Sequence, residues 1–411
     1  MNWSNQGGAG GMNSIGEKLV EALSVDAFGL LETSERQTIF DSKHLADALP
    51  LIYDDQEVSG GGTGSIFIPG DPYVDLTVSA STAGRRVRQS FDRFNYQPGK
   101  GLLILLTGIL GNPAPGITRR LGYFDDGNGI FFESAPDGLQ IVIRNKGVDS
   151  RVNISDWNRY SRAKPLDFSK AQIFSIEIEW LGVGDVTVAF VINRRKVPVH
   201  IFDHCNTLLT PYISNPNLPI RYEIIADGTN PAGDTLRHIC SSVMVQGGLN
   251  PVGFVYTAAR VTAFIMASNA LWQPLLSMRL SPDCLNATVE IINTISAIPL
   301  SNQDALIEVG VFINPTIGGT DTAAWERIPG SCVEVDTSRT SLNTLTLGTR
   351  ISGDYVTKDK QGVGDKEVRI PNVRKLGASI AGVPDQFVFA ARFLSGTAPT
   401  VFAMANILEL Q

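Results

Sequence analysis

Hydrophobic and polar residues alternate with a period of two along much of the chain, and this alternation predicts β-strands. The clearest example is IFSIEIEWLGVGDVTVAFVIN at 173–193, where Phe174, Ile176 and Ile178 share one face. Glycines and an aspartate at 182–185 provide turn residues before the alternation resumes. Two alternating runs separated by a turn predict an antiparallel hairpin.

Other runs along the chain extend this β pattern. LLILLTGIL at 102–110 is hydrophobic at nearly every position, which is typical of a central strand covered on both faces. FVFAARF and VFAMANILEL, near the end of the chain, are interpreted as closing strands, although their composition also suits helices. Many strands separated by Gly, Pro, Asn and Asp predict a mainly β protein, with a jelly-roll β-sandwich followed by a second β-sandwich.

The pattern divides the chain into three parts. We expect a flexible N-terminal arm with a short helix and linker at 1–64, the jelly roll at 65–260 and the second sandwich at 261–411. Ser14 and Glu17 fit a helix capping box. The side chains that would form one apolar face of this helix are Ile15, Leu19, Val20 and Leu23. Such a short helix needs a docking surface, either on its own core or on a partner as an anchor.

The composition limits the kinds of partner that we expect this protein to bind. Charged residues make up 18% of the 411 residues, which suits either a surface covered by neighbouring subunits or one rich in Ser, Thr and Asn. A net charge of -7 argues against nucleic acid as a partner. No run approaches the length of a membrane span and the N-terminus does not resemble a signal peptide, so we expect no membrane contact. Synthesis in a cytoplasm would keep the four scattered cysteines reduced.

Few residues of the sequence are candidates for catalysis or for metal binding. Glu177 and Glu179 are two residues apart on a predicted strand, which would place two carboxylates on one face, as some glycan hydrolases do. A row of solvated polar residues explains the same pattern. The FDDGNG turn at 124–129 suggests either a calcium ion at the rim of a sandwich or an ordinary hairpin turn. We predict no catalytic residue, no cofactor and no metal site.

Six phrases occur together in a recognisable order. They are AFGLLETSERQTIFDSK at 27–43, TAGRRVRQSFDRFNYQPGKGLLILLTGIL at 82–110, RRLGYFDDGNGIFFE at 119–133, IEWLGVGDVTVAFVI at 178–192, PNLPIRYEI at 216–224 and LRHICSSVMVQGG at 236–248. Together they resemble a family of structural virion proteins from tailed bacteriophages, with relatives in some large DNA viruses. The resemblance is specific over about 27–260 and looser towards the C-terminus. One departure is NRRKVPVH, where an Asp-Gly turn is expected near 193–196, so that hairpin is expected to be longer or altered.

The resemblance implies a concanavalin-A/laminin-G-like jelly roll in a virion component, with no catalytic residues to carry over. We therefore predict a non-enzymatic structural protein that assembles with copies of itself and other virion proteins. The tail, baseplate or fibre apparatus is favoured, and a capsid decoration or cement protein is the alternative. A carbohydrate-binding adhesion module is a further alternative, in which Trp157, Tyr160 and Tyr212 would stack on host surface glycans.

Overall fold

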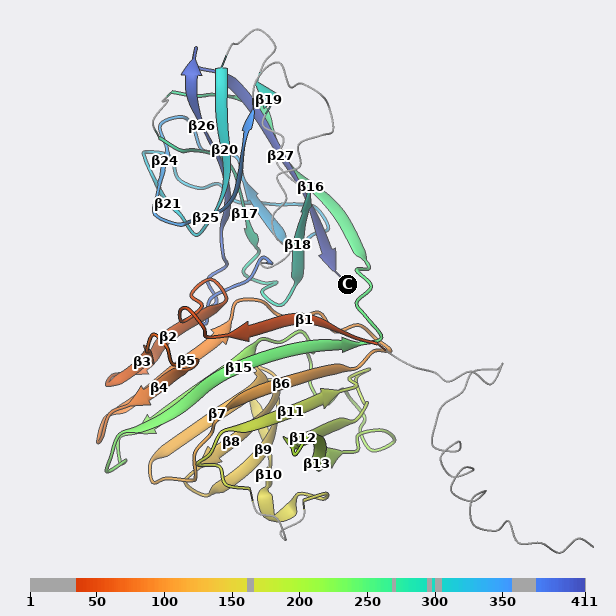
Figure 1. Cartoon of the computed structure of the whole chain (residues 1–411). Helices are drawn as coiled ribbons and strands as arrows, with labels where there is room; N and C mark the ends of the chain where they lie inside the picture. The colour runs from red at the N-terminus through yellow and green to blue at the C-terminus, as the bar shows by residue number, and fades with distance from the viewer. Residues whose placement is uncertain are drawn as a thin grey trace, which may run out of the picture.

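The computed structural model describes residues 35–160, 166–267, 271–293, 298–299, 305–356 and 375–410. Strands dominate these residues and form two β-sandwiches joined end to end (Figure 1). The mainly β, two-sandwich fold predicted from the sequence is confirmed. The predicted N-terminal helix lies outside the described residues. No helix in the described segments has the length and apolar character needed to cross a membrane.

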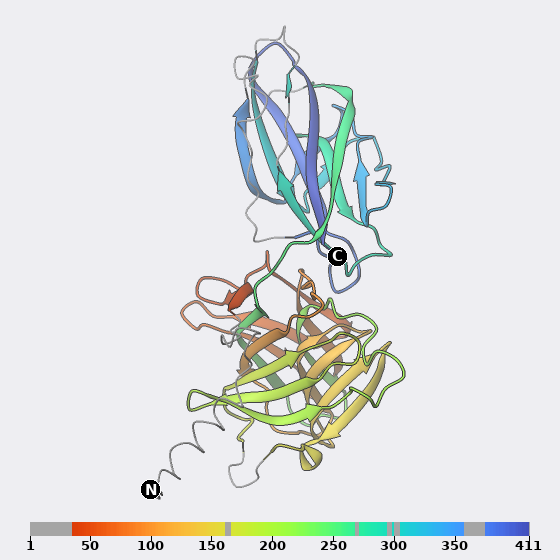
Figure 2. The same ribbon diagram turned by 90° about the vertical axis from the view of Figure 1, so that its right-hand side faces the viewer.

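The first sandwich is an antiparallel jelly roll of two sheets, seen in two views in Figures 1 and 2. Its eight-stranded sheet has the order β13-β12-β11-β6-β15-β4-β3, with β1 paired to β15, and its seven-stranded sheet has the order β10-β9-β8-β7-β14-β5-β2. The strands are β1 (Arg36–Lys43), β2 (Tyr53–Gly60), β3 (Thr63–Phe67), β4 (Val74–Val78), β5 (Ala83–Ser90), β6 (Leu102–Ile109), β7 (Ile117–Phe124), β8 (Gly129–Ala135), β9 (Gly138–Asn145), β10 (Val148–Asn153), β11 (Gln172–Ile178), β12 (Val186–Ile192), β13 (Arg195–Phe202), β14 (Ile220–Asp227) and β15 (Asp234–Gln246), with a short 3-10 helix η1 (Ile154–Asp156).

The predicted hairpin is present. Phe174 pairs with Phe190 and Ile178 with Val186, so β11 and β12 bury the hydrophobic face that the alternation predicted. β6 lies between β11 and β15, as expected for a strand that is apolar on both faces. The next hairpin is tighter than predicted, because Ile192 pairs with Arg195 and only two residues form the turn.

Those two residues, Asn193 and Arg194, have φ angles of 50° and 65°. Two consecutive positive φ values define the turn type that matches the twist of a two-residue hairpin, and Asn tolerates this conformation well. The Asn-Arg pair thus replaces Asp-Gly without lengthening the loop.

The N-terminal arm predicted for 1–64 is wrong from residue 36 onward. β1 pairs with β15 and β2 with β5, so residues from 36 onward belong to the jelly roll. RQTIFDSK and YDDQEVSG show no clear alternation, because these strands carry mostly polar residues and are exposed or half-buried at most positions.

The second sandwich packs a sheet with the order β16-β27-β18, with β19 paired to β27, against a sheet with the order β22-β23-β17-β26-β20-β25. The predicted boundary at residue 260 falls inside β16. The strands are β16 (Gly253–Ile265), β17 (Gln273–Leu280), β18 (Thr288–Asn293), β19 (Ile298–Pro299), β20 (Ala305–Ile313), β21 (Thr316–Gly318), β22 (Glu326–Arg327), β23 (Val333–Asp336), β24 (Thr344–Thr346), β25 (Thr349–Val356), β26 (Phe387–Gly396) and β27 (Thr400–Leu410), with β21 and β24 forming a separate ribbon.

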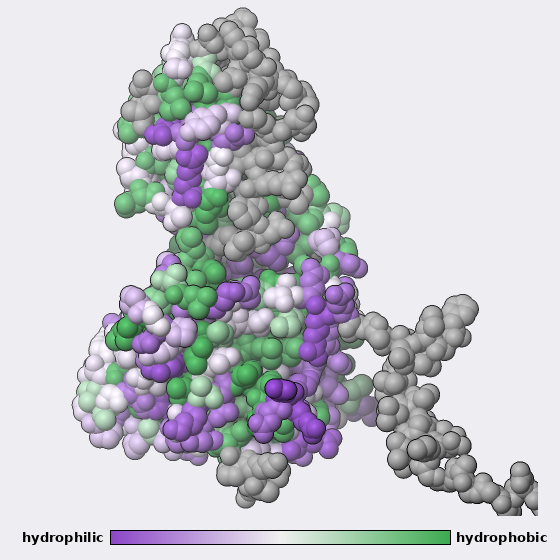
Figure 3. Space-filling model, in the orientation of Figure 1, coloured by the Kyte–Doolittle hydropathy of each residue, from purple (hydrophilic) through white to green (hydrophobic). Residues whose placement is uncertain are grey.

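Each sandwich has its own hydrophobic core. The first core draws its buried residues from 53–245 and the second from 258–407, and the two share no residue. FVFAARF and VFAMANILEL are the strands β26 and β27, and both contribute to the second core. Figure 3 views the outer surface of the eight-stranded sheet, where hydrophobic residues lie among hydrophilic ones.

The expectation of four reduced cysteines is wrong for one pair. Cys284 and Cys332 form a disulfide with their Cα atoms 5.6 Å apart, while Cys205 and Cys240 are free thiols. The pair is separated by 48 positions in the sequence, so only the pairing of β17 with β23 brings the two cysteines together.

Candidate functional site

The densest group of charged side chains lies on the outer side of the seven-stranded sheet. We call this group the arginine–carboxylate network; it consists of Arg85, Arg120, Arg144, Arg151, Arg221, Asp126, Glu133, Asp149 and Glu223. Most of its side chains are buried or half-buried. Buried charges are costly unless they are paired, and groups with shifted pKa values often mark functional sites. This network is therefore a candidate functional site.

Strand register places these residues side by side. Glu223 on β14 lies opposite Arg120 on β7, and Arg120 lies opposite Glu133 on β8. Residues directly opposite in adjacent strands share a face, so the three side chains form a row across the sheet. Arg151 on β10 extends this row through an ion pair with Glu133 at 2.8 Å.

Glu223 is the centre of the network. Its carboxylate accepts from Arg85 at 2.8 Å and from Arg120 at 2.7 Å, and Arg221 lies 3.6 Å away. Burial acts to raise the pKa of Glu223, but the three guanidinium groups outweigh it and hold that pKa below the ordinary value. Glu223 is therefore a fixed anion.

Asp126 connects the network to the FDDGNG turn. It pairs with Arg85 and Arg221, each at 2.6 Å, and these arginines lower the pKa of Asp126 to about 2 against the opposing effect of burial. The neighbouring Asp125 accepts from the backbone N–H of Gly127 and of Asn128, each at 2.8 Å. Both aspartates therefore already have partners in an ordinary turn, and within the described ranges no group of three or more potential ligands is placed to hold a metal ion.

A small aromatic cluster supports the arginines. Phe124, Phe131 and Val142 are buried on the outer side of the sheet, apart from the main core. The guanidinium of Arg144 lies 5.0 Å from the ring centre of Phe131, and that of Arg221 lies 5.4 Å from the ring centre of Phe124. These cation–π contacts fix the arginines over the rings. The network is thus a layer of five arginines and four carboxylates held together by ion pairs on the outer side of the sheet.

The network lacks the features of an acid–base catalyst. General acid catalysis at neutral pH needs a carboxyl group with a raised pKa beside an ionised one. In this network the pKa values of Glu223, Asp126 and Asp149 are all lowered, because ion pairs with arginines outweigh burial. These carboxylates hold the sheet together and have no proton to donate.

Glu177 and Glu179 do not form a catalytic pair on one strand face. β11 ends at Ile178, so only Glu177 lies within the strand. Glu177 accepts from Gln246 and pairs with Lys196, whereas Glu179 is exposed in the turn that follows, where its backbone N–H donates to Asp185. Glu177 therefore has two side-chain partners, whereas Glu179 lies one residue beyond the strand in a different environment.

The three candidate glycan-stacking aromatics pack inside the protein. Trp157 and Tyr212 are buried in the first core, and Tyr160 is half-buried against it. Trp157 stacks on Phe190 with ring centres 6.4 Å apart, and its Nε1–H donates to the Val152 carbonyl at 3.1 Å. Packing thus uses all three side chains, and the irregular chain around η1 folds Trp157 and Tyr160 against the core, an arrangement that alternation does not predict.

Arg85, Arg86 and Arg88, the densest basic cluster of the sequence, form ion pairs and are not a solvated face. Arg85 joins the network on the outer side, while Arg86 and Arg88, on the other face of β5, both pair with Asp55. Arg88 is buried at the inner side of the sheet. The alternation within RRVR separates these arginines, but their carboxylate partners are too distant in sequence to be identified from it.

Arg88 is the centre of a second buried group, the Arg88 cluster. Its members come from β1, β2, β5, β14, β15 and the residue after β1: Ser42, His44, Tyr53, Asp55, Arg88, Tyr222, His238 and Ser241. Arg88 donates to Asp55 at 3.0 Å, to His44 at 3.1 Å and to His238 at 3.3 Å. Seven of the eight members are buried, so the cluster fastens the N-terminal strands and offers no surface to a substrate.

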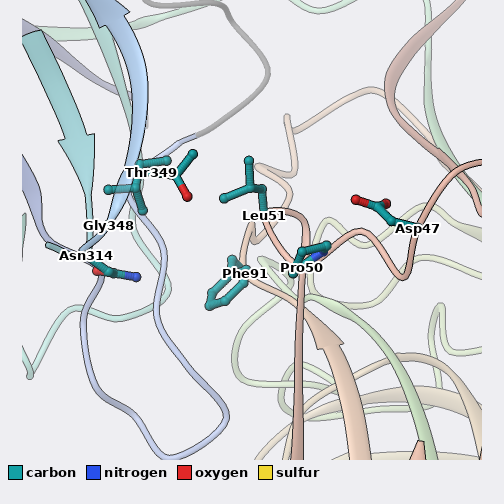
Figure 4. Close-up of a pocket in the computed structure, with 8 residues that line it drawn as sticks. Asp47, Pro50, Leu51, Phe91, Asn314, Gly348 and Thr349 are labelled. Atoms are coloured by element: carbon teal, nitrogen blue, oxygen red, sulfur yellow. The ribbon is translucent and has the colours of Figure 1, made fainter. Parts of the chain in front are cut away.

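A cavity of about 420 Å³ opens where the two sandwiches meet. Figure 4 shows Leu51 and Phe91 of the first sandwich facing Asn314 and Thr349 of the second. Asn314 Nδ2 already donates to Asp385 at 2.7 Å. The cavity is a junction between the sandwiches, where the Asp54 carboxylate also accepts from the Ile380 N–H at 2.7 Å.

No family model matches this chain, and no curated protein matches it. Among solved structures, the chain is similar to a legume lectin-like domain from Entamoeba histolytica, at 12% identity, covering 50% of this chain and 96% of that one, with a TM-score of 0.31. A protein of unknown function from Shewanella oneidensis MR-1 shares 13% identity over 61% of this chain and all of that one, with a TM-score of 0.36. The CBM2 module of the evolved Dit of Lactobacillus casei BL23 phage J-1 shares 8% identity over 53% of this chain and all of that one, with a TM-score of 0.35.

Proposed function

We propose that this chain is a non-enzymatic structural component of a bacteriophage virion that assembles as a homo-oligomer through its β-sandwich surfaces. Within the particle, we place it in the tail, baseplate or fibre apparatus. The observation that carries the proposal is an exposed hydrophobic edge strand, β16, on a rigid double sandwich. The ordered resemblance of six sequence phrases to virion proteins supports the assignment to a phage particle.

An edge strand with exposed hydrophobic side chains is a liability for a protein that acts alone. Monomeric proteins protect such strands because the unpaired backbone groups otherwise pair with other chains. In β16, Phe254, Val255, Val261 and Ile265 are all exposed. A subunit that is covered in its assembly has no need of that protection.

The chemistry of the described residues supports a structural role. The carboxylates of the arginine–carboxylate network are ion-paired, and the Arg88 cluster is closed to solvent. Trp157 and Tyr212 are part of the core, so the stacking platform suggested for a carbohydrate-binding module is occupied by packing. These contacts hold the first sandwich together, which suits a building block.

Mass spectrometry of purified particles of the phage that encodes the chain tests the proposal. We expect the chain among the abundant virion proteins, and its absence from washed particles would overturn the proposal. Electron microscopy with an antibody against the chain then locates it. Labelling of the tail or baseplate is expected, whereas uniform labelling of the head would support the decoration alternative.

A further inference from the structure

β16 is an edge of its sheet over its whole length. Among the described residues it pairs with β27 alone, residue for residue from Gly253 opposite Leu410 to Arg260 opposite Ala403. Figure 2 shows this long strand beside β27 at the front of the second sandwich. The straight segment 253–260 therefore has one side available to another strand.

The side chains of this edge are hydrophobic. Phe254 is 58% exposed, Val255 61%, Val261 82% and Ile265 65%. Met404 on β27, opposite Ala259, is also exposed and shares the face of Val255, which extends the apolar surface from the edge onto the sheet. Burying such residues against a partner would supply the main driving force for association.

The edge has no exposed charge. Arg260, the only charged residue in β16, is buried, with its Nη1 donating to the Leu275 carbonyl at 3.1 Å and its guanidinium 4.7 Å from the Phe264 ring centre. Most other edge strands carry charged residues, which discourage pairing, although β3 does not. Examples are Arg195 and Lys196 in β13, Asp149 and Arg151 in β10, Asp54 and Glu57 in β2, and Arg350 and Asp354 in β25.

A bulge limits the segment that can pair. Between Arg260 and Phe264, β16 advances by four positions while β27 advances by two, from Ala403 to Val401. The extra residues project Val261 outward and interrupt the line of backbone groups. Beyond the bulge the backbone N–H and C=O groups of β16 no longer line up with those of 253–260. The segment 253–260 is therefore the part of the edge that another strand can pair with.

We propose that 253–260 is an interface through which two copies of this chain pair, antiparallel, about a two-fold axis that crosses the middle of the segment. This rests on the homo-oligomeric role proposed above and names its surface. The two four-stranded sheets then form one continuous sheet across the dimer, with Val255 of each copy along the seam.

The absence of exposed charge on the segment 253–260 allows a second copy to occupy it despite the net charge of the chain. The chain carries a net charge of -7, so two copies repel each other over most of their surfaces. The segment 253–260 exposes no charged side chain, so two copies meet there without like-charge contacts. An antiparallel pair of identical strands is also self-complementary. Under a two-fold axis, every contact between one residue of the first copy and another residue of the second occurs a second time with the copies exchanged.

Sedimentation velocity of the purified full chain tests the interface. We expect a dimer with a dissociation constant of about 10 μM or lower. Val255→Lys should weaken dimerisation at least about tenfold, because the two-fold axis brings two added charges into one seam. The far-UV circular dichroism should stay unchanged, and so should the melting temperature measured at concentrations well below the dissociation constant, since Val255 is exposed in the monomer.

Val148→Lys is the matched control, because Val148 is an exposed valine on the edge strand β10, which already carries charges. It should leave the dimer intact. A monomeric wild-type chain at about 100 μM, or equal weakening by both variants, would overturn the pairing.

Particle mass spectrometry separates this inference from the proposed function. One result would show that another virion protein occupies β16 and would overturn the pairing of copies. In that result the chain is present in particles and monomeric in solution, and Val255→Lys is no longer incorporated. A chain that dimerises through β16 but is absent from particles would retain the interface and overturn the virion role.

Discussion

The Nε–H of Arg88 donates to His238 Nδ1 at 3.3 Å, within the first sandwich. That bond requires Nδ1 to be unprotonated, so the proton of the neutral ring is on Nε2, which lies 3.1 Å from Ser241 Oγ. His44 has the opposite arrangement, because its Nδ1 lies 2.8 Å from the Ile239 carbonyl and its Nε2 accepts from Arg88. Two neutral histidines thus surround one buried cation.

This arrangement predicts loss of stability in mild acid. Burial lowers the pKa of His44 from 6.5 to about 4, and burial also holds the pKa of His238 well below its ordinary value. Between pH 6.5 and 4 the unfolded chain binds a proton at His44 that the folded chain does not, so stability is complete above pH 6.5 and falls as the pH drops. His44 alone contributes on the order of 3 kcal/mol to this loss.

Urea unfolding at several pH values between 7.5 and 4 measures this dependence. His44→Gln should flatten the curve in that window, because the variant has no proton to bind at that position. An unchanged slope in the variant would contradict the assignment. The carboxylates of the arginine–carboxylate network act at lower pH, because the pKa of Asp126 is about 2.

Removing the charge of Glu223 should destabilise the first sandwich. Glu223→Gln replaces the buried carboxylate that pairs with Arg85 and Arg120 by a neutral amide. Breaking a buried ion pair costs about 3–5 kcal/mol. The free energy of unfolding from urea titration checks this value. Glu179→Gln, at an exposed position, is the control and should change stability by less than about 0.5 kcal/mol.

Trp157→Ala should behave as a core mutation. Loss of the stacked and edge contacts with Phe190 and Tyr160 leaves a cavity, with an expected cost of about 3–5 kcal/mol. Trp157→Phe keeps part of the volume and should cost less. If Trp157→Ala melted at the wild-type temperature while a measured glycan affinity disappeared, the packing role would be contradicted and the adhesion alternative would gain support.

Reduction of the disulfide should affect the second sandwich selectively. Cys284 and Cys332 close a loop with a sequence separation of 48, for which chain entropy gives a stabilisation of about 4 kcal/mol. Calorimetry with and without a reductant, and of Cys332→Ser, should show the melting of the second sandwich shifted down, and that of the first sandwich unchanged. A shift of both transitions together would mean that the two cores unfold as one unit.

The sequence alone determined the strands whose two faces differ. Alternation is a local property and predicted the β11–β12 hairpin, whereas continuous hydrophobic runs, which are equally local, predicted the central strand β6 and the closing strands β26 and β27. The composition and order of strands also predicted two sandwiches, because many antiparallel strands bury their faces by stacking sheets. Polar edge strands such as β1 and β2 carry no such pattern and were assigned to the arm.

Tertiary structure decided which distant residues meet. Glu223 and Arg85 are 138 positions apart, and only the pairing of β14 with β5 brings them together. The same holds for Cys284 with Cys332 and for the burial of Trp157. Sheet order decides which strands pair, which charges are buried and which edge, here β16, stays open. Sheet order in turn results from packing over the whole chain, so no local run of residues encodes it.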